Sequence, residues 1–191
     1  MTTTVLAFAG STRPDSLNQK LLHIAVSGVE AAGARVVHVR LADYPMPFYD
    51  TETERNSGIP ENAQKFQELL ANSDALLIAS PEYNGGYSAV LKNVIDWSSR
   101  STKDGKPGLA LFANKPVAVI SSSPGPLGGS KGQIGLRAVL EKIGMLSIPQ
   151  SFALGLADGA FTAENQLKDE NVDKQVRAVG EALAKIASKL R

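Results

Sequence analysis

The sequence contains no cysteine, and this absence excludes several kinds of site at once. Without thiols the chain cannot form disulfides, use a thiolate nucleophile or build a cysteine-ligated zinc site. A chain of 191 residues can still bury a sufficient core without such cross-links. A cysteine-free chain suits a reducing compartment, so we expect a cytoplasmic protein that folds as one domain over residues 1–191.

An excess of one charge and long apolar runs are also absent. The chain has 20 Lys and Arg against 19 Asp and Glu, which gives no electrostatic reason to expect a nucleic acid or a membrane surface as partner. No segment approaches the ~20 consecutive apolar residues that a membrane span needs. The N-terminus lacks the basic segment of a signal peptide. We therefore expect a soluble protein that binds neither nucleic acid nor a membrane.

Histidine is scarce, with two in the chain. His23 falls in an expected helix and His38 in an expected strand, each away from other plausible ligands. Metal sites in proteins need several converging ligands. We expect structural or exposed roles for both imidazoles and predict no metal site.

Short apolar runs alternate with segments of helical periodicity along the whole chain. Such strict alternation predicts a doubly wound parallel α/β sheet with helices on both faces. The expected strands are 5–9, 35–41, 75–79, 116–120 and a weaker one within 145–154. The expected helices are 17–29, 61–72, 89–99, 131–143 and a last one whose apolar stripe runs from Val172 to Leu190.

Two segments are longer than connections between such elements usually are. The first, Tyr44 to Pro60, is rich in proline and aromatic residues, and the second, Ser101 to Asn114, carries Leu109, Leu111 and Phe112. The second segment is open to two interpretations, a solvated excursion or a dimer contact.

Small and polar residues are concentrated in the loops after the first, third and fourth strands. In a five-stranded sheet of order 2-1-3-4-5 these three strands are neighbours. Ligands of open α/β sheets bind beyond the carboxyl ends of the strands, where the strand order reverses. The three loops would therefore line one crevice about two strand spacings, roughly 10 Å, across, which suits a tricyclic ring.

Each loop, taken alone, has both a functional and an ordinary interpretation. Ser11, Arg13 and Ser16 lead into a helix and could bind a phosphate, with Asn18 bracing the loop, or Ser16 could merely cap the helix. The loop from Ser80 to Ser88 could aim backbone N–H groups at a planar ligand or could be a tight turn. The loop from Ser121 to Ser130 could cover a ring or be a flexible connector. Their convergence favours a ligand.

The three loops carry motifs that resemble those of the NADPH-dependent FMN reductase family, which includes quinone, chromate and azo-dye reductases. The motifs are Gly10-Ser11-x-Arg13-x-x-Ser16-x-Asn18, Pro81-Glu82-Tyr83-Asn84-Gly85 and Ser122-Ser123-Pro124-Gly125. The resemblance implies a flavodoxin-like fold with FMN as cofactor. It assigns the phosphate to the first loop, the isoalloxazine to the second and the other side of the ring to the third. The implied cofactor-binding residues are Ser11, Arg13, Ser16, Leu17, Asn18, Pro81, Glu82, Tyr83, Asn84, Gly85, Ser122, Ser123, Pro124 and Gly125.

The resemblance also implies a reaction. FMN would pass electrons from NADPH or NADH to a small acceptor, such as a quinone, an azo compound, a metal oxyanion or free flavin, in a ping-pong cycle. The cofactor performs this chemistry, so we predict no catalytic acid or base. The family further implies a homodimer or a dimer of dimers. One alternative is a flavodoxin-type electron carrier that does not oxidise nicotinamide itself, although such carriers are typically acidic and this chain is near neutral. Another is a flavin-free relative of this fold whose loops bind a nucleotide or serve as an interaction surface.

Overall fold

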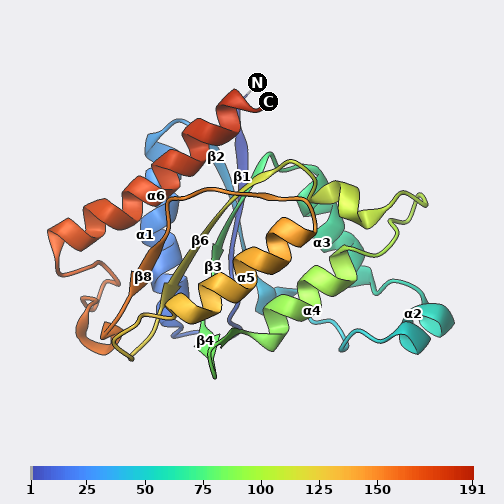
Figure 1. Ribbon diagram of the computed structural model, residues 1–191, viewed down its shortest axis with the longest axis horizontal. Coiled ribbons are helices and arrows are strands. Elements are labelled where there is room, and N and C mark those ends of the chain that lie inside the picture. The colour runs from blue at the N-terminus through green and yellow to red at the C-terminus, as the bar shows by residue number, and fades with distance from the viewer. Residues whose placement is uncertain (1) are drawn as a thin grey trace.

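The computed structural model describes residues 2–191, which form a central sheet with helices on both faces (Figure 1). The sheet order β2-β1-β3-β6-β7 confirms the predicted order 2-1-3-4-5, and its strand pairs are all parallel. The strands are β1 (Thr4–Ala9), β2 (Arg35–Arg40), β3 (Ala75–Ala79), β6 (Pro116–Ser122), β7 (Leu146–Ser147) and β8 (Phe152–Leu154). The central strands are buried on both sides, as their continuous apolar runs require.

The fifth position of the sheet is shared by two short strands. β7 pairs with the start of β6, where Pro116 is opposite Leu146. β8 pairs with the end of β6, where Ile120 is opposite Phe152. Pro149 lies between them and has no N–H to donate to a ladder, so the pairing is interrupted there. This interruption explains why the strand signal in 145–154 is weak.

The helices form two layers. α1 (Leu17–Ala31) and α6 (Glu170–Lys189) cover one face of the sheet, and α3 (Glu61–Ala71), α4 (Ala89–Ser98) and α5 (Ser130–Lys142) cover the other (Figure 1). β1 serves both layers, because Val5 and Ala7 point toward α1 and α6 while Leu6 and Phe8 point toward α3 and α4.

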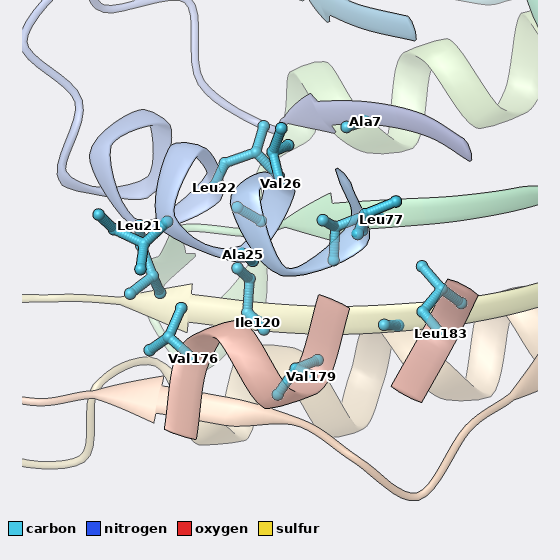
Figure 2. Close-up of a cluster of buried hydrophobic side chains, with 14 of the residues drawn as sticks. Ala7, Leu21, Leu22, Ala25, Val26, Leu77, Ile120, Val176, Val179 and Leu183 are labelled. Atoms are coloured by element: carbon cyan, nitrogen blue, oxygen red, sulfur yellow. The ribbon is translucent and has the colours of Figure 1, made fainter. Parts of the chain in front are cut away.

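α1 and α6 cross at very short range. Leu21 and Ala25 of α1 and Val176 and Val179 of α6 gather over Ile120 of the sheet (Figure 2). At the crossing itself a Cβ atom on Gly28 would lie 2.0 Å from the carbonyl oxygen of Arg177, and one on Gly180 would lie 2.0 Å from that of Ala25. The two backbones are therefore in direct contact. The expected apolar stripe is wrong at its end, because Leu190 lies beyond the helix and is 56% exposed.

The segment from Tyr44 to Pro60 contains a helix that the apolar pattern does not predict, which makes six α-helices rather than five among residues 2–191. This helix, α2 (Thr51–Ser57), has no buried residue. Its N-cap is Asp50, whose side chain accepts hydrogen bonds from the N–H groups of Glu52 and Thr53. The segment before it is fastened to α4. The side-chain amide of Asn93 donates a hydrogen bond to Pro47 O at 2.9 Å and accepts one from the Tyr49 N–H at 2.8 Å. The indole N–H of the buried Trp97 donates to Pro47 O at 2.7 Å.

The segment from Ser101 to Asn114 is partly folded into the core. It contains a 3₁₀ turn, η2 (Gly108–Leu111), and Phe112 is buried among the side chains of the α3 and α4 layer. Leu109 is 48% exposed. Residues 101–107 are mostly exposed, whereas Phe112 anchors the end of the segment in the core. Among residues 2–191, none of the helices combines the length and the apolar composition that crossing a membrane requires.

Candidate functional site

The three loops meet at one cleft of about 430 Å³ at the carboxyl ends of β1, β3 and β6. This volume lies within the range of ordinary small-molecule sites. The cleft is lined by Ser11, Arg13, Asp15, Ser16, Leu17, Asn18, Lys20, Pro81, Glu82, Tyr83, Ser122, Ser123, Pro124 and Asp158. Of the residues predicted from the sequence, Asn84, Gly85 and Gly125 do not line it. Asp15, Lys20 and Asp158 line it without having been predicted.

The N-terminus of α1 forms one end of the cleft. Ser16 is the N-cap, and its hydroxyl oxygen accepts a hydrogen bond from the Gln19 N–H at 3.4 Å. Ser16 therefore caps the helix, and its hydroxyl proton can still be donated to a ligand. The first turn holds no acidic residue, and Lys20, one turn after the N-cap Ser16, also lines the cleft. The positive end of the helix dipole therefore faces a cleft that can receive a phosphate.

Arg13 lies at the rim of this end. Its guanidinium contacts Asp15 at 3.3 Å, and both side chains are exposed. The hydrogen bond from Arg13 and its charge lower the pKa of the Asp15 carboxyl below its ordinary value. Asp15 thus remains ionised and offsets part of the charge that Arg13 brings to the cleft.

The floor of the cleft is made by a contact between the first and third loops. The Asn18 amide donates to Ser122 O at 2.9 Å and accepts from the Ser122 N–H at 3.0 Å, and both residues are buried. The hydroxyl of Ser122 is also buried, yet it has no hydrogen-bond partner within residues 2–191. A buried hydroxyl without a hydrogen-bond partner destabilises the fold unless a ligand or a water molecule bonds to it.

The second loop is a short β-hairpin with a two-residue turn. β4 (Glu82–Tyr83) pairs with β5 (Gly86–Tyr87), and the connecting Asn84 and Gly85 have φ angles of 52° and 79°. Positive φ at both central residues is what a type I′ turn requires, and Asn-Gly is its preferred sequence. The tight turn expected as one alternative is therefore present, and its tip is exposed at the edge of the cleft.

The third loop is not a flexible connector. The Ser123 N–H donates to Leu154 O at 3.0 Å, the Ala157 N–H donates to Ser123 O at 3.1 Å, and the Leu156 N–H donates to Gly125 O at 3.1 Å. These bonds fasten the loop to the segment that follows β8. They also bring Asp158, in a 3₁₀ turn after that strand, to the cleft. No motif in the sequence signals Asp158, because its placement depends on these long-range bonds.

The two histidines lie outside the cleft and are not separated as the sequence suggested. Their ring centroids are 4.6 Å apart, edge to face, because β2 carries His38 on the face that α1 covers. Within residues 2–191 no cluster of three or more His, Asp or Glu side chains has the arrangement of a metal site.

Comparison with known proteins assigns the chain that forms this cleft to a family. The model of the NADPH-dependent FMN reductase family matches residues 3–159, which include all three loops. The chain belongs to this family. An NAD(P)H-dependent FMN reductase of Pseudomonas aeruginosa is 33% identical over 190 residues, covering 98% of this chain and 96% of that protein. An NAD(P)H:quinone oxidoreductase of Solanum tuberosum is 31% identical over 192 residues, covering 98% and 94%.

A solved structure supports the same assignment. The flavoenzyme NAD(P)H:(acceptor) oxidoreductase of Paracoccus denitrificans superimposes with a TM-score of 0.81 at 28% identity, covering 98% of each chain. As an NADPH-dependent FMN reductase family member the protein is an enzyme that uses FMN, with a reduced nicotinamide as co-substrate. Bound FMN supplies the capacity to accept a hydride and release electrons.

The cleft fits this cofactor on independent grounds. The anionic phosphate group matches the N-terminus of α1, with Ser11 and Ser16 buried beside it. The unpartnered hydroxyl of Ser122 matches a polar ligand atom in the floor. Asn84 and Gly85, two of the motif residues that do not line the cleft, form the turn at its edge.

Proposed function

We propose that the cleft binds FMN and that the protein transfers electrons from NADPH or NADH to a small acceptor of the quinone type. The observation that carries the proposal is the convergence of three loops on a cleft whose floor holds the buried, unpartnered hydroxyl of Ser122. Relatives whose names describe quinone oxidoreductases and quinone reductases support this class of acceptor.

The residues of the cleft would bind and orient rather than react. Ser11, Ser16 and the first turn of α1 would hold the phosphate, with Arg13 and Lys20 adding positive charge. Pro81 and Tyr83 would line the ring, and Ser122 to Gly125 would close its other side. No side chain is assigned as a proton donor or acceptor in this proposal, because the cofactor performs the chemistry.

Both half-reactions would use the same exposed part of the cleft, one after the other. The tip of the hairpin and Tyr83, 57% exposed, leave an open edge where a nicotinamide or a quinone can approach. With both partners using this edge, the first product would leave before the acceptor enters. The proposed cycle is therefore ping-pong.

The visible spectrum of the protein with FMN tests the proposal. We expect a bound flavin band near ~450 nm, its bleaching on anaerobic addition of NADPH or NADH, and its recovery on addition of a quinone. If flavin binds and neither nucleotide bleaches it, the protein is an electron carrier of the flavodoxin type. If no flavin binds, the assignment of the cleft fails.

We also propose that the protein is a cytoplasmic homodimer or dimer of dimers. Phe48, Leu109 and Ile134 are large apolar side chains with exposed fractions of 78%, 48% and 71%, which a second copy could cover. The absence of cysteine supports a reducing compartment. Light scattering during size-exclusion chromatography tests the assembly, and a monomer at micromolar concentration would exclude it.

A further inference from the structure

The hairpin at the edge of the cleft is too small to hold its own position. β4 and β5 have two residues each, joined by the Asn84–Gly85 turn. An isolated two-stranded hairpin is at best marginally stable in water, and this one has only two residue pairs. Whatever fixes the hairpin to the rest of the protein therefore decides where its tip lies.

Glu82 makes the side-chain hydrogen bond that joins the hairpin to α5, beside the packing of Tyr87 against the core. Its Oε2 atom accepts a hydrogen bond from the Gly132 N–H at 2.8 Å, between residues 50 positions apart. Gly132 lies in the first turn of α5, which has no acidic residue, and the N-cap residue Gly129 makes no side-chain capping bond. The carboxylate of Glu82 thus serves as the cap of α5 from outside the helix, where the helix dipole favours a negative charge.

The surface of α5 is shaped to receive the hairpin. A Cβ atom on Gly132 would lie 3.2 Å from Glu82 Cβ and 3.3 Å from its Cγ. One on Gly135, the next residue along the same face, would lie 3.6 Å from the ring of Tyr87. The absence of a side chain at Gly132 therefore leaves room for Glu82, whereas a methyl group at Gly135 would make only an ordinary contact. Glu82 is half-buried in this contact and also lines the cleft.

We propose that Glu82 is a positioning residue, whose carboxylate seats the Asn84–Gly85 tip against the flavin by capping α5 and does not itself bind the cofactor. The inference rests on the proposed FMN site. Its physical basis is that the N–H groups of the tip can stabilise reduced flavin only when the turn is held at a fixed distance from the ring. The reach of the side chain should matter more than its charge.

Two variants separate reach from charge. Glu82→Gln keeps the length and an oxygen acceptor and removes the charge. Glu82→Asp keeps the charge and withdraws the carboxylate by one methylene, ~1.5 Å. The readouts are the Kd of FMN for the apo-protein, from quenching of flavin fluorescence, and the midpoint potential of bound FMN, from equilibration with a reference dye.

Positioning predicts opposite behaviour for the two variants. We expect Glu82→Gln to stay within about twofold of the unmodified protein in Kd. We expect Glu82→Asp to raise Kd about tenfold, equivalent to about 1.4 kcal/mol, and to lower the midpoint potential. If the charge itself acted on the flavin, Gln would be the impaired variant and Asp the normal one, and the inference would be overturned. Equal values for all three proteins would overturn it as well.

Gly132→Ala approaches the same contact from the helix, because its methyl group would push Glu82 outward. It should match Glu82→Asp in both readouts, and a normal potential in this variant would count against the inference. Glu141→Gln, at the exposed far end of α5, controls for loss of a charge on that helix. Failure of the unmodified protein to bind FMN would instead refute the proposed site, so the two failures are distinguishable.

Discussion

Asn18 and Ser122 exchange two hydrogen bonds across 104 residues of sequence, the Asn18 amide donating to Ser122 O and accepting from the Ser122 N–H. The amide of Asn18 satisfies a strand-end peptide group in the manner of a neighbouring strand. It thereby locks the start of α1, the proposed phosphate end of the cleft, to the end of β6, which forms its floor.

Asn18→Ala should destabilise the protein by about 3 kcal/mol, because it leaves a buried N–H and a buried carbonyl without partners. The same change should weaken FMN binding, since the two loops lose their common support. Urea unfolding of the apo-protein and FMN titration measure the two effects. Asn72→Ala, which removes an exposed amide bonded to Glu68 O, is the control and should cost less than ~0.5 kcal/mol. Unchanged stability in Asn18→Ala would contradict the role of this contact.

Ser16→Asp should abolish FMN binding without unfolding the protein. Aspartate is as good an N-cap as serine, so α1 is preserved. Two unit charges 4 Å apart near a protein surface interact by about 4 kcal/mol, so repulsion of the phosphate should weaken FMN binding by at least ~100-fold. Ser16→Asn, a neutral cap, should bind FMN far better than Ser16→Asp. Stoichiometric FMN in purified Ser16→Asp would place the phosphate elsewhere.

Gly28→Ala and Gly180→Ala should each destabilise the protein by about 3 kcal/mol, because the new methyl group meets a backbone carbonyl that cannot move aside. The sign of this stability change is informative, since replacing Gly by Ala in a helix interior ordinarily stabilises a protein by up to ~1 kcal/mol. Gly135→Ala, whose Cβ would make an ordinary contact with Tyr87, should be neutral or stabilising. Thermal unfolding of the apo-proteins measures all three. Stabilisation by Gly28→Ala would disprove the backbone contact.

His38 should make folding sensitive to mild acid. Burial lowers the pKa of His38 below its ordinary value of 6.5, and the charge of His23 lowers it further. The unfolded chain then binds more protons than the folded one, so stability is full above pH 6.5 and is lost as the pH falls through the folded pKa. His38→Gln removes this loss, so its stability relative to the unmodified protein should improve from pH 7.5 to pH 5.

Urea unfolding at constant ionic strength measures this difference. His23→Gln removes only the second cause and should give a smaller improvement. The explanation would be wrong if the difference between His38→Gln and the unmodified protein were the same at both pH values.

The sequence predicted the sheet and the three loops because both follow from local patterns. Buried parallel strands appear as unbroken apolar runs, and the loops after them are marked by serine, glycine and asparagine. α2 was missed because it has no buried face, and its signals were only the cap Asp50 and the following Gly58. The bonds from Asn18 to Ser122 and from Glu82 to Gly132 depend on how distant segments meet, which no local pattern encodes.

The crossing of α1 and α6 has a consequence for the order in which the protein matures. α6 follows α1 and the strands of the sheet in the sequence, so it leaves the ribosome after them. Until it emerges, the apolar face of α1 that it covers is open to water or to chaperones. The helix that we propose receives the phosphate thus acquires the support of α6 only after the sheet strands have been synthesised. Cofactor loading should therefore follow the emergence of α6.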